Sequence, residues 1–342
     1  MRFRLNRGVQ ILYIVLGIAV VSSCSINRMM VRRFSDVLSG GDGVNVFTTD
    51  DDPELIAAAL PFVLKLHDAL LEQDPDNEAL IVSAASGYIS YANAFLQTPA
   101  AMLEPHQFEE RERMLERAKK LYLRGRDLAL QRLVSRYPDL RQSAESPEFD
   151  VALQRTEPSD VPLLYWAAAG WAGAWSTEPF DLDLALSVPV AARLMERAYQ
   201  LQPDFDDGAI HEFYISYYAA LPQGLGGDRQ LARKHFARAV DLAAGRKSSP
   251  YVTLALAVAL PEQNLEEFVE LMQQALQVDP EEAPEYRLVN EIRRREARWY
   301  LEHLDRFFLL DDWDDLDNWG EWDDWDERDE SGAGGRFPDG TS

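Results

Sequence analysis

The chain repeats one short pattern in which a helix-like segment ends at a proline that is followed by an acidic residue. The pattern occurs at 66–77 (LHDALLEQDPDN), at 194–205 (LMERAYQLQPDF) and at 271–282 (LMQQALQVDPEE), each time with a leucine nine residues before the proline. Proline cannot continue an α-helix, and it also pushes the preceding residue out of helical geometry. Three helices that end at the same phase predict a repeating helical unit.

The second helix of each unit carries small and large residues at fixed spacing. The sets are Ala191, Met195 and Ala198; Ala232, Phe236 and Ala239; and Phe268, Met272 and Ala275. This is the tetratricopeptide spacing, in which one helix pair cannot bury its apolar face alone and must stack on its neighbours. The copies are degenerate, because the recurring alanines are farther apart than the 34 residues of that repeat, and the first half of the consensus is mostly missing.

The helical pattern predicts an all-α fold of stacked antiparallel helix pairs, followed by a C-terminal helix. No alternating run is long enough to propose a strand. Helix punctuation is dense, with Asn264 and Glu267 forming a capping-box pattern and Gly226, Gly227 and Asp228 separating two helices. The expected helices are 53–73, 77–97, 105–136, 159–176, 187–202, 206–221, 228–244, 250–260, 264–278 and 284–310.

The N-terminus has the pattern of a bacterial lipoprotein signal. Arginines precede an apolar run from about Val9 to Val21 that is short for a membrane-spanning helix, and Ser22 and Ser23 then precede Cys24, the only cysteine. We therefore expect cleavage before Cys24 and acylation of that residue. Ser25 rather than Asp follows it, which favours the outer over the inner membrane. The alternative is an uncleaved membrane anchor in which Cys24 is incidental.

Composition excludes some classes of function. The formal net charge of −24 repels nucleic acid and anionic lipid headgroups, so we expect no nucleic-acid partner. An apolar content of 46% is ordinary for a globular protein with a sizeable core. With one cysteine there is no disulfide framework. The predicted organisation is a signal peptide (1–23), a linker after lipidated Cys24 (24–53), a helical domain (54–310) and an acidic, tryptophan-rich, disordered tail (311–342).

Several long phrases resemble one known family. In chain order they include "DPELIAAALPFVLKLHDALLEQDPDN", "GYISYANAFLQTP", "LLYWAAAGWAGAW", "HEFYISYYAALPQGLGGDRQLARKHFARAVDLAAGRKSSP" and "RLVNEIRRREARWYLEHLD". Together they resemble the TatT family, which comprises periplasmic lipoproteins associated with TRAP (tripartite ATP-independent periplasmic) transporters. The resemblance covers roughly residues 24–304.

The resemblance implies a fold of cryptic tetratricopeptide repeats and a role in transport. A member of this family is expected to be a periplasmic lipoprotein that binds the solute-binding P component of the transporter, as a homo-oligomer, and to have a pore through its body. The alternative is a general tetratricopeptide lipoprotein that mediates protein–protein interactions in outer-membrane or cell-wall assembly.

The first helices of the pairs are rich in aromatic residues, and in a stacked array these helices line the inner surface. We expect the pore, or a ligand- or partner-binding surface, to include tyrosines and tryptophans there, because such rings offer apolar walls with polar groups that orient a ligand. The alternative is that these rings fill the core. We expect Asn93 to be a pore-lining or structural polar anchor, since a buried amide needs hydrogen-bond partners. The candidate residues are Tyr88, Tyr91, Asn93, Phe95, Trp171, Trp175, His211, Tyr214, Tyr217 and Tyr218.

No pattern in the chain supports catalysis, a metal or a cofactor. His211 and Glu212 begin like a zinc-peptidase helix, but Ile215 stands where the second histidine is required. The sequence has no nucleophile elbow and no P-loop. A window at Asp315–Gly320 imitates a calcium loop but places Trp319 at a ligand position. We therefore predict a non-catalytic protein with no bound metal or cofactor.

Overall fold

The computed structural model describes residues 46–142 and 146–309, and within these ranges every regular element is a helix. The longer helices are α2 (Pro53–Gln73), α3 (Glu78–Ala92), α5 (Phe108–Arg136), α6 (Pro147–Gln154), α7 (Val161–Thr177), α8 (Leu182–Leu201), α9 (Ala209–Ala220), α10 (Arg229–Leu242), α11 (Ser249–Leu254), α12 (Leu265–Gln277) and α13 (Arg287–Glu302). The expected all-α fold of stacked helix pairs with a C-terminal helix is confirmed.

Capping side chains determine where the helices begin. Asp52, Asn77, Asp181, Asp228 and Asn264 each accept a hydrogen bond from a backbone amide in the first turn of the following helix. Such a cap satisfies one of the amides that lack a partner at a helix start. Each helix start therefore depends on local sequence, which is why the punctuation of the chain predicted most of them.

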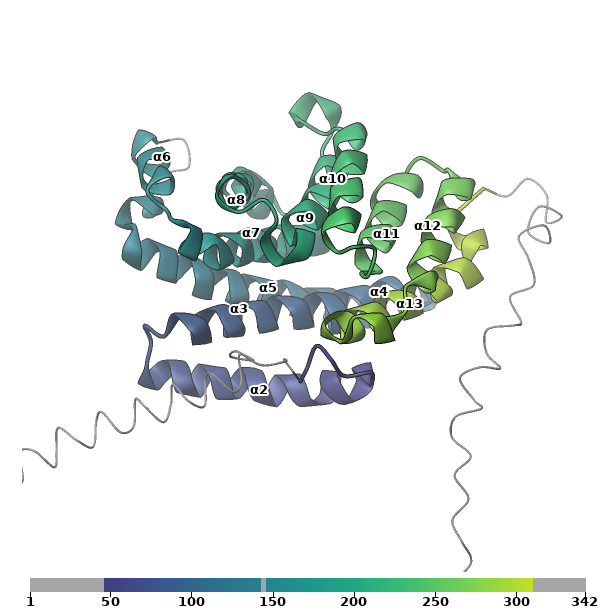
Figure 1. The fold of residues 1–342 in the computed structure, drawn as a ribbon, viewed down its shortest axis with the longest axis horizontal. Coiled ribbons are helices and arrows are strands. Elements are labelled where there is room, and N and C mark those ends of the chain that lie inside the picture. Colours follow the sequence, from purple (N-terminus) through teal and green to yellow (C-terminus); the bar gives the residue numbers. More distant parts are fainter. Residues whose placement is uncertain (1–45, 143–145, 310–342) are drawn as a thin grey trace, which may run out of the picture. The chain divides into compact units, whose positions relative to one another are not determined.

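Two stacks of helices make up the unit that ends at Glu302. In the first stack α2 packs on α3, α3 on α5, α5 on α7 and α7 on α8, and Figure 1 shows α2, α3 and α5 side by side. In the second stack α9 packs on α10, and α11, α12 and α13 follow. The second unit begins at His303 and contains a short 3₁₀ turn at Leu304–Arg306.

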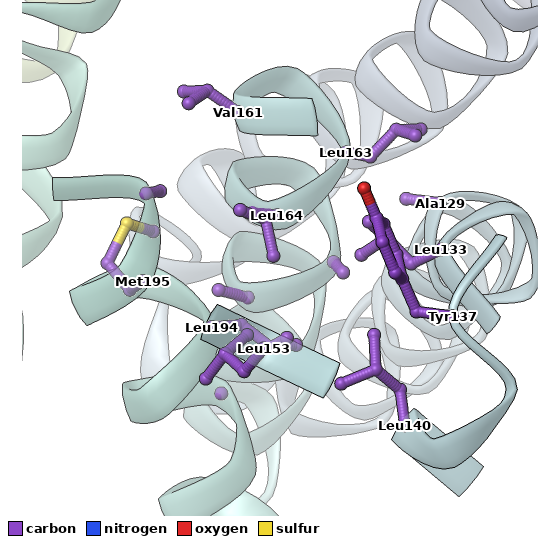
Figure 2. Close-up of a cluster of buried hydrophobic side chains, with 14 of the residues drawn as sticks. Ala129, Leu133, Tyr137, Leu140, Leu153, Val161, Leu163, Leu164, Leu194 and Met195 are labelled. Atoms are coloured by element: carbon purple, nitrogen blue, oxygen red, sulfur yellow. The ribbon is translucent and has the colours of Figure 1, made fainter. Parts of the chain in front are cut away.

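The largest core cluster lies in the first stack (Figure 2). Leu133 of α5, Leu164 of α7 and Leu194 of α8 are completely buried in it. The short helix α6, which the sequence did not predict, contributes Phe149 and Leu153 to the same cluster. Most of the predicted small and large residues also belong to the core, since Ala198, Ala239, Phe268, Met272 and Ala275 are all fully buried, whereas Phe236 is partly exposed.

The C-terminal helix α13 returns to the start of the described chain. The amide of Leu288 donates to the carbonyl of Thr48 at 3.0 Å, and Arg295 pairs with Glu54 at the start of α2. Arg293 donates through Nη2 to the Oδ1 atom of Asn93 at 3.1 Å. These contacts join residues about 200 or more positions apart, so the two stacks form a closed ring of helices.

Among residues 46–142 and 146–309, one segment is long and apolar enough to cross a membrane by length and composition. It covers Glu78–Ala101, which includes α3. In the structure α3 packs against α2, α5 and α7 and buries Leu80, Ala84 and Tyr88. The apolar character of this segment is therefore explained by its place in the core of the helical stack.

Candidate functional site: a cavity inside the ring

The ring of helices surrounds a cavity of about 1230 Å³. Its wall comes mainly from α3, α7, α9, α11 and α13. The first four are the helices that the repeat pattern places on the inner surface. Of their partner helices, α10 and α12 contribute no lining residue, α5 contributes Tyr122, and α8 contributes Val188, Ala191 and Ala192. The volume lies somewhat above the usual range for small-molecule pockets, so the cavity can hold a drug-sized solute together with water.

Aromatic side chains form much of the wall. Phe95, Tyr165, Trp166, Trp175 and Tyr217 all line the cavity. Tyr165 packs edge-on against Trp166, with ring centroids 4.9 Å apart. Large rings in contact with each other lose little freedom when a ligand binds, and they offer it a wide apolar surface.

Two π-helical turns line the cavity, at Asn93–Gln97 and at Ala255–Ala259. An inserted π turn shifts the following side chains around the helix axis, and such turns are frequent at functional sites. In the first turn, Gln97 accepts a hydrogen bond from the Tyr122 hydroxyl at 2.6 Å and donates to Ser176 at 2.9 Å. The turn therefore connects α3 with α5 and α7 by polar contacts at the cavity wall.

Charged side chains of alternating sign line another part of the wall. Arg293 of α13 donates to the Glu296 carboxylate at 2.5 Å, and the Glu296 side chain is only 4% exposed. Nearby, Lys247 lies 3.9 Å from the carboxylate of Glu212, which also interacts with Arg293. Burial raises the pKa of Glu212, and the nearby Lys247 charge opposes that shift. Each of these two buried cations therefore already has a carboxylate neighbour.

The turn before α9 is held in an unusual conformation beside these charges. Asp206 and Asp207 both have φ of 48°, and Gly208 has φ of 97°. Two successive non-glycine residues in the left-handed region cost conformational energy that the surroundings must offset. Lys247 supplies one compensation, because its ammonium donates to the carbonyl of Asp206 at 2.9 Å, and the Tyr286 hydroxyl donates to the Asp207 carboxylate.

The structure places only part of the predicted aromatic set on the cavity wall. Asn93, Phe95, Trp175 and Tyr217 line the cavity, whereas the remaining candidates do not: Tyr88, Tyr91, Trp171, His211, Tyr214 and Tyr218. Each helix presents only part of its surface to the cavity, so side chains that are spread around one helix cannot all reach it.

The predicted aromatic residues that do not line the cavity pack between helices instead. The Tyr88 hydroxyl donates to Asp68 at 2.8 Å, and the guanidinium of Arg124 lies over the same ring. The indole of Trp171 donates to Ser187 of α8 at 2.6 Å. These contacts account for the aromatic residues through helix packing.

His211 belongs to a small buried cluster between α8, α9 and α10. Its Nδ1 atom lies 2.8 Å from Nδ1 of His235, and the ring of Tyr218 stacks on His235. Tyr214, in the same cluster, donates to Glu196 at 3.3 Å. Among residues 46–142 and 146–309, no group of three or more His, Cys, Asp or Glu side chains is arranged to hold a metal ion.

The charged residues of the cavity wall were not predicted from the sequence. Arg293 and Glu296 lie in "NEIRRREARWY", a run whose composition is typical of a solvated helix face. Arg293 contacts Asn93, 200 positions earlier, and a contact over that separation has no local signal in the sequence. Lys247 follows a glycine and an arginine in a predicted turn, and nothing local indicates that its side chain is buried. No single-sequence pattern marks these residues.

The fold and the cavity define a helical-repeat protein with an internal cavity. The family model described as "TRAP transporter T-component" matches residues 49–308. A protein of Treponema pallidum (strain Nichols), described as an uncharacterized protein, is 35% identical over 303 residues, which are 84% of this chain and 94% of that protein. The chain belongs to the TRAP transporter T-component family, as its resemblance to TatT proteins predicted, and its role is that of a transporter-associated protein.

Proposed function

We propose that this protein binds the solute-binding P component of a TRAP transporter and passes a small solute through the cavity inside its ring of helices. Membership of the T-component family supports the association with a transporter. The observation that carries the solute-handling role is the cavity of about 1230 Å³, with its aromatic wall. The proposed mechanism is binding and transfer, without bond chemistry.

The proposed location is the periplasm, with the protein attached to a membrane through acylated Cys24 and the outer membrane favoured. Family membership supports a periplasmic, membrane-associated protein. Cys24 and the tail (311–342) lie outside the described residues.

Direct binding tests the partner. Full-length protein in detergent is mixed with the purified P component of its own organism, and complex formation is measured by calorimetry and size-exclusion chromatography. We expect a complex of fixed stoichiometry with a dissociation constant in the micromolar range or tighter. Absence of a complex at tens of micromolar would contradict the proposal and favour a general role in envelope assembly.

Filling the cavity tests the path of the solute. Ala172 of α7 lines the cavity, so Ala172→Trp places an indole in the space. Ala58 of α2 is exposed and does not line the cavity, so Ala58→Trp is a matched control. We expect A172W to retain the P component but to lose most transporter-dependent solute uptake in cells, while A58W retains both. Equal uptake by the two variants would exclude transfer through the cavity.

A further inference from the structure

The wall of the cavity carries more negative than positive side chains. Its five carboxylates belong to Asp206, Asp207, Glu212, Glu285 and Glu296, and its three cations belong to Arg246, Lys247 and Arg293. An excess of one sign of charge around a cavity with low-dielectric walls attracts solutes of the opposite sign and repels those of the same sign. The charge of the wall therefore narrows the class of solute that the cavity can hold.

The two buried cations of the wall already donate to groups of the protein. The Lys247 ammonium donates to the carbonyl of Asp206 at 2.9 Å. The two terminal nitrogens of Arg293 donate to Glu296 at 2.5 Å and to Asn93 at 3.1 Å. An anionic solute would have to displace one of these acceptors, so neither cation is a preformed anion site.

The carboxylate of Glu212 is less completely paired than these cations. Its side chain is 20% exposed and lines the cavity. The ammonium of Lys247 lies 3.9 Å away, which is too far for a hydrogen bond, and the Ser249 hydroxyl supplies a neutral donor. Burial raises the pKa of Glu212 even though Lys247 and Arg293 oppose the rise. The neighbouring cations therefore do not offset the full cost of burying this negative charge, and a cationic solute beside it would.

Aromatic rings lie next to Glu212 on two helices. Phe213 and Tyr217 line the cavity from the same helix, α9, and their rings stack with centroids 5.8 Å apart. Tyr165 of α7 also lines the cavity, and burial and then the charges of Asp206 and Glu212 raise the pKa of its hydroxyl. The faces of aromatic rings attract ammonium groups. A partly paired carboxylate beside such rings has the chemistry that recognises an organic cation.

We propose that the cavity binds an organic cation, either a protonated amine or a quaternary ammonium, with its charge beside Glu212 and an apolar body against the aromatic wall. Leu256, Val289 and Ile292 also line the cavity and favour a solute whose body is apolar. This inference rests on the proposed function, because it takes the cavity as the path of the solute and names the class of that solute.

Three small probes with a shared benzyl group test the preferred charge. Benzyltrimethylammonium is the cation, benzyl alcohol the neutral probe and phenylacetate the anion. Each is titrated into full-length protein in an uncharged detergent at pH 7.5 and low salt, and binding is measured by calorimetry. We expect the cation to bind at least tenfold more tightly than either other probe. Equal or tighter binding of phenylacetate, or no binding of the cation at millimolar concentration, would overturn the proposal.

Glu212→Gln tests the carboxylate, because it removes the charge and keeps the shape of the side chain. Glu266→Gln is the matched control, since Glu266 is exposed on α12, a helix that does not line the cavity. We expect E212Q to bind benzyltrimethylammonium at least tenfold more weakly than wild type and benzyl alcohol within twofold of wild type. E266Q should bind every probe within twofold of wild type. Equal affinity of E212Q and wild type for the cation would exclude Glu212 as its partner.

Phe213→Leu tests the aromatic wall without changing any charge. It keeps an apolar side chain but removes one ring face, so we expect about threefold weaker binding of the cation. Phe108→Leu is the control, because Phe108 is 61% exposed and does not line the cavity. Circular dichroism and melting temperature establish that each variant is folded. If E212Q does not fold, the probe series on wild type and the Phe213→Leu variant still decide the proposal.

The outcomes separate this inference from the proposed function. If wild type forms a complex with the P component but does not prefer the cation, the proposed function stands and the solute is not an organic cation. If wild type prefers the cation through Glu212 but forms no complex with the P component, the proposed function fails while the cation site stands.

Discussion

At the scale of single residues, the histidine pair His211 and His235 can share one proton but disfavours a second. The Nδ1 atoms of His211 and His235 are 2.8 Å apart, a distance at which one proton lies between them and two protons repel. Burial, then the charge of His235 and then that of Arg238 lower the pKa of His211 to about 4. Tyr199 and Tyr214 pack around the pair and offer no carboxylate to stabilise a second proton.

This pair predicts that the protein loses stability as the pH falls. The folded-state pKa of His211 lies below the unfolded value of about 6.5, so the unfolded chain binds more protons between these two values. We expect His211 to reduce the free energy of unfolding by about 1 kcal/mol between pH 7.5 and pH 5.5. His211→Asn should flatten the pH dependence of urea unfolding by that amount. His106→Gln, at an exposed position, should leave it as steep as in wild type.

Lys247 predicts a second effect at the residue scale. Its side chain is 8% exposed, its ammonium donates to the carbonyl of Asp206, and it lies over the ring of Tyr286. Lys247→Met keeps the aliphatic length but removes the charged donor that supports the left-handed turn. We expect a loss of about 2–3 kcal/mol in unfolding free energy, measured with urea. Exposed Lys234→Met should change it by less than about 0.5 kcal/mol, and an equal loss in both variants would contradict this role.

At the scale of elements, glycines allow α3, α5 and α7 to pack closely. A Cβ atom on Gly125 of α5 would lie 2.7 Å from the carbonyl oxygen of Ala85 in α3. A Cβ atom on Gly170 of α7 would lie 2.8 Å from the carbonyl oxygen of Tyr122 in α5. Both obstacles are backbone atoms, which cannot move aside without shifting a helix. The separation of these three helices is therefore set by glycine.

Gly170→Ala should consequently destabilise the protein, although alanine favours a helix by about 1 kcal/mol over glycine. Overpacking typically costs about 1–3 kcal/mol, so we expect a net loss of about 1 kcal/mol or more in urea unfolding. Gly224→Ala is the control, because nothing lies within 4 Å of a Cβ atom there. If the Gly170→Ala protein is as stable as wild type, α5 and α7 can move apart at little cost in free energy.

Most helices could be predicted from the sequence, since their ends depend on nearby residues. Asp52 and Pro53 begin α2, and Asn264 caps α12 through the amide of Glu267. The helix α6 was missed because its eight residues are too short for a periodic pattern. The π turn at Asn93–Gln97 was predicted as ordinary helix, because a single inserted residue leaves the apolar pattern almost unchanged.

At the scale of the whole molecule, closure of the ring decides which residues face the cavity. Asn290 of α13 is completely buried; its side chain accepts from the amide of Ser248 and donates to the carbonyl of Arg246. Arg293 then reaches Asn93 on the opposite stack. The position of α13 is thus fixed from both stacks at once. Contacts between distant segments produce no recognisable pattern in the nearby sequence. The sequence therefore predicted which helices line the cavity, but not that Arg293, Glu296 and Lys247 do.

Asn93→Ala should loosen this closure. The change removes the acceptor for the Nη2 atom of Arg293 and leaves the Arg293–Glu296 pair intact. We expect amide hydrogen exchange to become faster in residues 287–302 and 46–52 than in the rest of the described chain, because the contact between the stacks weakens. Uniformly faster exchange throughout would instead indicate a general loss of stability, and unchanged exchange would mean that the other closing contacts suffice.

Closure by the last helix also constrains the order of events during synthesis. The contacts of Leu288 with Thr48 and of Arg295 with Glu54 join the end of the ring to its beginning. The aromatic side chains that α7 and α9 contribute to the cavity wall therefore stay exposed until α13 has been made and has packed. Exposed apolar surface of this kind is prone to aggregate. Truncations before Arg287 should thus yield insoluble protein and a burden on chaperones, whereas intact chains escape that risk only at the final step.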